Sequence, residues 1–324
     1  MRIEGERFLV TGGLGFLGRH LARALVDRGA SVVVLDRDEA RARIRPGLPD
    51  SDRLAVIAGD LRTVDLAAAL RGCTAVFHLA ASPDVREGEA RPRAVFEDNV
   101  LATARLLDGM REAGVTQLAF PSTSTVYGEA TVVPTPEDYT PLAPVSAYGA
   151  SKVAGEGLIH GFAAKHDLTA AILRLANVVG GGATHGVVYD LVRKLKANPR
   201  ELEILGREPG TRKSYVHIDD TVDAWFRAWS AIDRGVETYN VGSEDAITVR
   251  ELADRVCAAV GLSGVSYRWT GGVDGGGWKG DVRTMALAVD RLRALEWRPR
   301  HGSGEAVSRA AKALASEFGD PRAA

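Results

Sequence analysis

The sequence predicts an α/β protein with a doubly wound parallel sheet and a smaller mixed α/β lobe toward the C-terminus. Short apolar runs alternate with amphipathic helical segments over the first half of the chain. These runs are apolar throughout, which is typical of parallel strands covered by helices on both faces. After about residue 178 the rhythm loosens into glycine-rich stretches separated by helices, which indicates a second lobe.

Each element is predicted from the spacing of its apolar residues. The expected strands are Phe8–Val10, Val32–Leu35, Leu54–Ile57, Ala75–Leu79, Leu118–Phe120 and Ala171–Leu173. Helical periodicity predicts helices over Leu17–Arg28, Val95–Ala113 and Ala147–Ala164, and later over Val187–Lys196, Val249–Val260 and Glu305–Phe318. We therefore expect a first domain of residues 1–178, with 215–245 returning to it, and a second lobe of residues 179–214 and 246–324.

Composition limits the classes of function. The 324 residues include 45% hydrophobic ones, enough for a large core, and the net charge of −1 would not attract nucleic acid or an anionic membrane. Cys73 and Cys257 lie in apolar surroundings, as reduced core thiols do, and no apolar run is long enough to span a membrane. His160 and His166 fall on different helix faces, so no metal is expected. We expect a cytoplasmic protein.

A glycine-rich turn joins the first predicted strand to the first helix. Gly12, Gly15 and Gly18 occur where a tight turn, close approach of a pyrophosphate and close helix packing require glycine, although a plain flexible turn is the alternative. Asp36 ends the next strand, where a carboxylate accepts hydrogen bonds from the adenosine ribose and repels a 2′-phosphate. The pattern predicts a Rossmann-type domain that binds NAD rather than NADP, while Arg37 leaves NADP open.

A tyrosine and a lysine form the candidate catalytic pair. Tyr148 and Lys152 are four residues apart in a predicted helix, so they share one face. A nearby cation favours the phenolate form of a tyrosine, and with the further positive charge of nicotinamide Tyr148 would act as a base near neutral pH. This spacing alone is common on solvated helix faces. Ser122–Thr125, however, form a hydroxyl cluster at the end of an apolar strand, where open α/β sheets place their active sites.

These segments together resemble the extended short-chain dehydrogenase/reductase family, which contains nucleotide-sugar epimerases. The likeness runs from about residue 7 to 300. It rests on the order of Thr11–Gly18, Asp60, His78–Ala81, Asn99, Ser122–Gly128, Tyr148 with Lys152, and Leu173–Val178. Tyr239–Gly242 is similar to the family's strand and turn that return to the main sheet.

The resemblance implies a role for each matching residue. Tyr148 would be the acid/base, Thr123 would hydrogen-bond the reacting sugar oxygen, and Lys152 would bind the nicotinamide ribose. The implied NAD contacts are Gly12, Gly15, Phe16, Leu17, Gly18, Asp36, Arg37, Asp60, Leu61, Leu79, Ala80, Ala81, Asn99, Ser122, Tyr148, Lys152 and Leu175.

The substrate contacts implied by the resemblance come from both the first domain and the second lobe. Lys213 occupies the position of a family arginine that contacts phosphate, and Arg212 shares that role or is simply solvated. The full set of implied contacts is Ser82, Arg86, Thr123, Ser124, Asn177, Val188, Arg212, Lys213, Lys279 and Asp281.

The residues after Thr123 favour one reaction among those of the family. Dehydratases carry carboxyl groups there, whereas this chain has Ser124 and Thr125, which are neither acids nor bases near neutral pH. We therefore expect 4-epimerisation of a nucleotide-diphosphate sugar through a transient 4-keto sugar, on a UDP-hexose such as UDP-glucose or UDP-galactose. A UDP-glucuronate 4-epimerase, a 4,6-dehydratase, a 4-ketoreductase and an inactive NAD-sensing regulator remain alternatives. The resemblance also implies a homodimer formed through residues 95–113 and 147–165.

Overall fold

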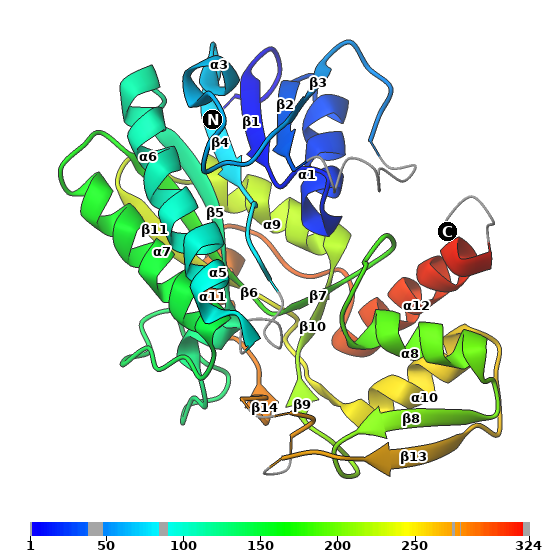
Figure 1. Ribbon diagram of the computed structural model, residues 1–324. Helices are drawn as coiled ribbons and strands as arrows, with labels where there is room; N and C mark the ends of the chain where they lie inside the picture. The colour runs from blue at the N-terminus through cyan, green and yellow to red at the C-terminus, as the bar shows by residue number, and fades with distance from the viewer. Residues whose placement is uncertain (1, 38–47, 84–89, 274–275, 279, 320–324) are drawn as a thin grey trace. The chain divides into compact units, whose positions relative to one another are not determined.

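The computed structural model describes residues 2–37, 48–83, 90–273, 276–278 and 280–319 (Figure 1). The chain divides into two compact units. Unit 1 contains residues 1–126, 141–174 and 222–239, and unit 2 contains residues 127–140, 175–221 and 240–324. Residues 127–140 thus belong to unit 2, although they fall within the first domain expected from the sequence.

Unit 1 contains most of a seven-stranded sheet with the order β11-β6-β5-β4-β1-β2-β3. Strand β1 runs parallel to both β2 and β4, β2 runs parallel to β3, and β4 runs parallel to β5. The strands are β1 (Arg7–Thr11), β2 (Ser31–Asp36), β3 (Leu54–Ala58), β4 (Ala75–His78), β5 (Gln117–Thr123), β6 (Thr169–Leu175) and β11 (Val236–Val241). The predicted α/β class and parallel sheet are confirmed, including the return of Tyr239–Val241 to the sheet as part of β11.

Helices connect these strands, as the alternating pattern predicts. They are α1 (Phe16–Asp27), α3 (Leu66–Leu70), α5 (Pro92–Phe96), the π-helical segment η1 (Glu97–Leu101), α6 (Ala102–Ala113), the 3₁₀ turn η2 (Ser124–Tyr127), α7 (Ala147–Ala163) and α9 (Ile218–Ser230). The helix expected over Val95–Ala113 is therefore interrupted by a π-helical turn. Helix α9 was not predicted.

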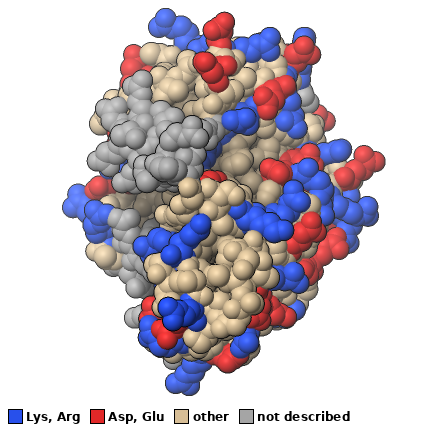
Figure 2. Space-filling model, turned by 90° about the vertical axis from the view of Figure 1, so that its right-hand side faces the viewer, with Lys and Arg blue, Asp and Glu red and all other residues tan. Residues whose placement is uncertain are grey.

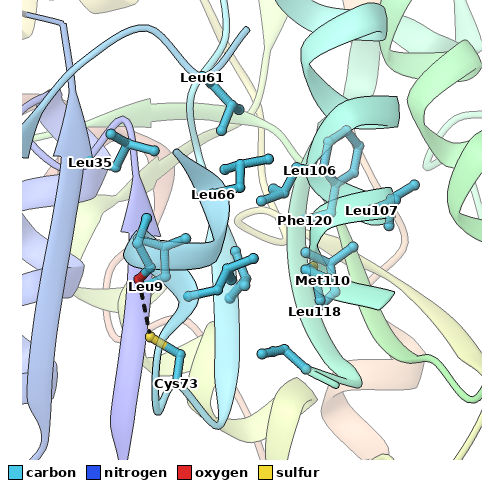
Figure 3. Packing of buried hydrophobic residues seen from close by; sticks show 14 of the residues in the cluster. Leu9, Leu35, Leu61, Leu66, Cys73, Leu106, Leu107, Met110, Leu118 and Phe120 are labelled. Atoms are coloured by element: carbon cyan, nitrogen blue, oxygen red, sulfur yellow. Dashed lines mark hydrogen bonds between the residues drawn. The ribbon is translucent and has the colours of Figure 1, made fainter. Parts of the chain in front are cut away.

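The pleat of the strands sends alternate side chains to opposite faces of the sheet. Leu9 of β1 joins a buried cluster that includes residues of α3, α6 and α7. Figure 3 shows part of this cluster, with Leu66 of α3 facing Leu106 of α6. Phe8, the neighbour of Leu9, points the other way and stacks edge-on against Trp229 of α9 at 5.4 Å between ring centres. The helical layers on both faces therefore bury the sheet.

Unit 2 has its own core. Its elements are β7 (Asn177–Val179), α8 (Val187–Ala197), β8 (Glu201–Leu205), β9 (Arg212–Lys213), β10 (Tyr215–His217), β12 (Ile247–Thr248), α10 (Val249–Ala259), β13 (Ser266–Thr270), β14 (Thr284–Met285), α11 (Asp290–Ala294) and α12 (Ser303–Gly319). Apolar faces of α8, α10 and α12 pack together with strand β8. Helix α10 begins with a capping box between Thr248 and Glu251, which satisfies N–H groups at its start.

The two cysteines lie in the core, as the sequence predicts. Cys73 and Cys257 are buried free thiols, and Trp225, Trp229 and Trp297 are buried as well. In the parts of the chain that the structure describes, no cluster of side chains is suited to hold a metal ion. No helix among the described residues is both long and apolar enough to cross a membrane. On the face shown in Figure 2, lysine and arginine side chains are interspersed with aspartate and glutamate.

Candidate active site

The turn after β1 is shaped to accept a phosphate group. Gly12 has a φ of +65°, and a Cβ atom there would lie 2.6 Å from the backbone nitrogen of Ala80. A Cβ on Gly18 would lie 2.2 Å from the carbonyl oxygen of Gly12, so both positions require glycine. Helix α1 starts at Phe16, and no side chain among the described residues caps its N–H groups. This end of the helix suits the pyrophosphate of a dinucleotide.

A chain of buried hydrogen bonds joins this turn to the loop after β4 and to η1. The backbone nitrogen of Ala80 donates to Oγ1 of Thr11 at 3.1 Å, and Thr11 Oγ1 lies 2.8 Å from Nδ1 of His78. Nε2 of His78 lies 2.9 Å from Oγ1 of Thr103, which donates to the carbonyl of Asn99 at 2.6 Å. Burial lowers the pKa of His78 to about 3, so its imidazole is neutral.

Asp36 lies at the end of β2, as predicted, and its carboxylate accepts hydrogen bonds within the same edge of the sheet. Oδ2 accepts from the backbone nitrogen of Leu14 at 2.8 Å, and Oδ1 accepts from that of Arg37 at 2.8 Å. Burial raises the pKa of Asp36, while these two N–H groups oppose the rise. Each carboxylate oxygen keeps a lone pair that a ribose hydroxyl can use.

Four charged residues beside Asp36 form a closed ring of ion pairs. Arg37 lies 2.7 Å from Asp98 and 3.9 Å from Asp60, and Arg62 lies 3.2 Å from Asp98 and 2.6 Å from Asp60. The hydrogen bond from Arg62 lowers the pKa of Asp60 to about 2. Both arginines are therefore engaged by carboxylates. Sequence reasoning missed Arg62 and Asp98, since nothing in the local pattern marks these surface charges.

The other expected NAD contacts also lie in unit 1, with the exception of Leu175. Leu61 is buried beside Asp60, and Leu79 to Ala81 follow β4. Asn99 lies in the π-helical segment η1, a distortion that often occurs at functional sites. Its side chain accepts from the backbone nitrogen of Ser82 at 2.7 Å and donates to Oγ of Ser151 at 2.9 Å. Asn99 thus ties the loop after β4 to helix α7. Leu175 is the last residue of β6 and is counted with unit 2.

The hydroxyl cluster and the catalytic pair meet where β5 ends against α7. The Thr123 side chain lies beside the Tyr148 phenol and acts to lower its pKa, and Thr123 Oγ1 lies 3.1 Å from Thr125 Oγ1. The ammonium of Lys152 donates to the carbonyl oxygen of Pro121 at 2.8 Å and lies 5.9 Å from the centre of the Tyr148 ring. Ser146 caps the start of α7 by accepting from the backbone nitrogen of Gly149.

The protonation of the pair in the chain alone is set by burial. We expected the lysine cation, together with the positive charge of nicotinamide, to produce the tyrosine phenolate; without nicotinamide, burial raises the pKa of Tyr148 to about 12, and the Thr123 side chain only partly opposes this. Burial also lowers the pKa of Lys152 to about 8. Desolvation therefore dominates in the chain alone, and further positive charge beside the pair is needed to produce a phenolate near neutral pH.

Ser122 and two residues that were not predicted form a buried ionic cluster next to this pair. The hydroxyl of Ser122 donates to Oε1 of Glu156, so Ser122, which we expected to contact NAD, turns its hydroxyl into the protein. Arg174 binds the same carboxylate through two hydrogen bonds, of 3.0 and 2.7 Å. Glu156 is four residues after Lys152, and that spacing on one helix face was the signal that could have found it.

Unit 2 carries the expected phosphate-binding residues. Lys213 is ion-paired with the buried carboxylate of Asp281, and its ammonium lies 5.4 Å from the centre of the Trp278 ring. Asn177 donates to the carbonyl of Ser214 at 3.0 Å, whereas Arg212 is exposed. Val188 is only 3% exposed and belongs to the apolar core of unit 2. Arg86 and Lys279 lie outside the described residues.

A dinucleotide-type glycine turn together with a Thr123, Tyr148 and Lys152 cluster defines an enzyme of the short-chain dehydrogenase/reductase type. The sequence profile described as "NAD dependent epimerase/dehydratase family" matches residues 8–242. The chain belongs to this family.

Similar proteins match nearly the whole chain. The chain is 33% identical to the UDP-glucose 4-epimerase of Mycolicibacterium smegmatis, over 94% of this chain and 96% of the relative. A UDP-glucose 4-epimerase of Corynebacterium glutamicum is 30% identical over 97% of each chain. A UDP-galactose 4-epimerase crystal structure superposes with a TM-score of 0.82 at 38% identity, covering 96% of this chain and 99% of that one. The structure of MoeE5 in complex with UDP-glucose and NAD superposes with a TM-score of 0.85 at 32% identity, covering 97% of this chain and 100% of that one.

Proposed function

We propose that this protein is an NAD-dependent nucleotide-sugar 4-epimerase that acts on a UDP-hexose such as UDP-glucose or UDP-galactose through a transient 4-keto sugar. The observation that carries the proposal is the cluster of Thr123, Tyr148 and Lys152 at the end of β5, next to Ser124 and Thr125 rather than carboxyl groups. One acid/base group suffices for epimerisation, whereas loss of water across C5 and C6 requires a further acid and base. Relatives at 30–33% identity bear the name UDP-glucose 4-epimerase.

Each member of the catalytic set has a proposed task. Tyr148 takes the proton of the sugar C4 hydroxyl and later returns it, while the Thr123 hydroxyl holds the same oxygen. Lys152 supplies a fixed positive charge beside the phenol. Bound NAD would supply a reversible hydride acceptor for sugar C4. Tyr148, with a pKa of about 12 in the chain alone, would ionise near neutral pH only with the added positive charge of the nicotinamide ring.

The adenosine end of the site favours NAD over NADP. Asp36 would accept hydrogen bonds from the ribose hydroxyls and would repel a 2′-phosphate. Arg37, the residue that left NADP open, is held by Asp98 and Asp60. Asp60 and Leu61 are proposed to line the adenine pocket, and Ala80 and Ala81 the pyrophosphate side, as the family resemblance implies.

Lys213 is proposed to bind the diphosphate of the substrate. Arg212, which precedes it in the sequence, and Asn177, which donates to the carbonyl of Ser214, are proposed to assist. Lys213 is a point charge without the fork of an arginine, and Asp281 fixes its position by an ion pair. Ser82 and Ser124 remain proposed contacts of the sugar. A structural neighbour, MoeE5, has been solved with UDP-glucuronic acid as well as with UDP-glucose, so a glucuronate substrate is the second candidate.

A homodimer is proposed to form through one face of unit 1. A shallow hollow of about 540 Å³ lies on α7 and η1 and is lined by Val100, Ala154, Gly157, Leu158, Gly161, Phe162, Lys165 and His166. A Cβ atom on Gly157 or Gly161 would meet nothing within 4 Å, and Leu101 is 61% exposed nearby in η1. Small residues beside exposed apolar ones allow a second copy to pack closely.

The two buried free thiols fit the proposed location in the cytoplasm.

Product analysis tests the proposed reaction. The purified protein would be incubated, without added cofactor, with UDP-glucose, UDP-galactose, their N-acetyl forms and UDP-glucuronate, and the products read by NMR. Interconversion at C4 supports the proposal and names the sugar. Loss of water, accumulation of a 4-keto product, or no turnover of any of these sugars would overturn it. The last result would favour an NAD-sensing regulator.

A further inference from the structure

Three consecutive residues at the end of β5 lie beside three residues of α7. The carbonyl of Pro121 accepts from Lys152, the hydroxyl of Ser122 donates to Glu156, and the Thr123 side chain lies beside that of Tyr148. Tyr148, Lys152 and Glu156 follow one another at intervals of four residues, so they lie on one face of the helix. Two hydrogen bonds, one from Lys152 to Pro121 and one from Ser122 to Glu156, therefore hold the helix that carries the catalytic pair against the end of β5.

The Glu156 carboxylate is itself held on a second side. Arg174 of β6 donates from Nε to Oε1 at 3.0 Å and from Nη2 to Oε2 at 2.7 Å. Glu156 is 4% exposed and Arg174 is 6% exposed, so water contributes little to the solvation of either charge. Because Ser122 and Arg174 come from two different strands, the carboxylate links β5, β6 and α7 at one point.

The charge of Glu156 acts on a lysine whose cationic form is disfavoured. Lys152 is 4% exposed, and burial lowers its pKa to about 8, while the carboxylate of Glu156 opposes this fall. The other titratable groups around Lys152 among the described residues give no such support. His78 on β4 is neutral, Tyr148 is protonated, and Arg174 on β6 is a cation bound to Glu156.

We propose that Glu156 is a positioning residue of the active site, which keeps Lys152 protonated in the working pH range and holds α7 in register with Thr123. Glu156 is bound by Ser122 and Arg174 and acts only through Lys152 and the helix. The proposal rests on the proposed function, because the value of a protonated Lys152 comes from its place beside Tyr148. The competing explanation is a buried ion pair that serves packing alone, and such pairs can often be replaced without loss of stability.

Direct titration of Lys152 separates the two explanations. The protein, with the NAD that it retains, would be labelled with [ε-¹³C]lysine and followed by ¹H–¹³C NMR from pH 6 to 10.5, with the Lys152 signal assigned through Lys152→Met. In Glu156→Gln the midpoint of this signal should fall by about one pH unit, as expected for loss of a nearby opposite charge. Glu156→Gln/Arg174→Gln removes both charges and should give a smaller fall. Asp108→Asn, which removes an exposed carboxylate of α6, is the matched control and should leave the midpoint unchanged.

The pH profile of the reaction provides the second readout. In Glu156→Gln the alkaline limb of kcat should move down with the Lys152 midpoint, while the affinity for NAD stays the same. If Glu156→Gln does not fold, the double variant is titrated in its place, and the smaller fall is the result expected of it. A folded variant whose Lys152 midpoint equals that of the parent overturns the proposal. Failure of the proposed reaction is distinguishable, because the NMR titration reports on Lys152 whether or not a sugar is turned over.

Discussion

The buried ammonium of Lys152 should reduce the stability of the protein, and replacing it with methionine should therefore stabilise the NAD-free chain. A fall in pKa from an ordinary value of 10.5 to about 8 corresponds to ~3 kcal/mol of unfavourable free energy for the charged form at neutral pH. Loss of the hydrogen bond to the Pro121 carbonyl would offset ~1 kcal/mol of the gain. We expect Lys152→Met to raise the free energy of unfolding by ~2 kcal/mol at pH 7.

The pH dependence of this difference is the sharper test. Between pH 8 and 10.5 the unfolded chain binds a proton at Lys152 that the folded chain does not, so the stability of the parent protein rises with pH in that window. The advantage of Lys152→Met should therefore be present at pH 7 and nearly absent at pH 10. Urea denaturation at both values measures it, with Lys312→Met, a change at an exposed lysine, as the control. A variant that unfolds at lower urea than the parent at pH 7, or an advantage that persists at pH 10, would refute the reasoning.

Three further predictions concern catalysis, cofactor choice and assembly. Tyr148→Phe should lower kcat by roughly 10³-fold while the protein still retains NAD, because only the proton-transferring group is lost; kinetics and the NAD content of the purified variant check this. Asp98→Asn should release Arg37 and raise the affinity for NADP⁺ relative to NAD⁺ by about threefold to tenfold in calorimetric titrations of NAD-free protein; an unchanged ratio contradicts the role given to the ring of ion pairs. Gly157→Arg should give a folded monomer by light scattering, since a Cβ at this site meets nothing within 4 Å; an intact dimer would place the interface elsewhere.

Much of the fold of unit 1 could be predicted because its strands are continuous runs of apolar residues in the sequence. The observed β2 and β3 extend the expected runs by no more than a residue or two at either end. The π-helical turn at η1 could not be predicted, because a single wider turn hardly changes the spacing of apolar residues over Val95–Ala113. Helix α9 was missed because its acidic start obscured its apolar face, which carries the buried Trp225 and Trp229 and packs on the sheet.

The candidate site could be predicted wherever a residue type and a spacing carry the chemistry. Gly12, Asp36 and Tyr148 lie where such patterns place them, on the edge of the sheet or on the helix beside it. The protonation of Tyr148 could not be predicted, because it depends on which atom the Lys152 ammonium contacts and on how much water burial removes. Arg174 was missed for a related reason, since its partner Glu156 is eighteen residues away in the sequence.

The buried His78 has a consequence for how the active site responds to pH. The neighbours of His78 fix the direction of every hydrogen bond in this series. The series starts at an amide donor, the backbone nitrogen of Ala80, and ends at a carbonyl acceptor, that of Asn99. Thr11 must then donate to Nδ1 and Nε2 must carry the proton, so the network assigns a single tautomer. With His78 neutral above pH 4 and Tyr148 protonated to about pH 12, Lys152 is the one member of these three that changes charge in the physiological range. The imidazole is thus an inert connector, and it adds no second ionisation to the response of the site.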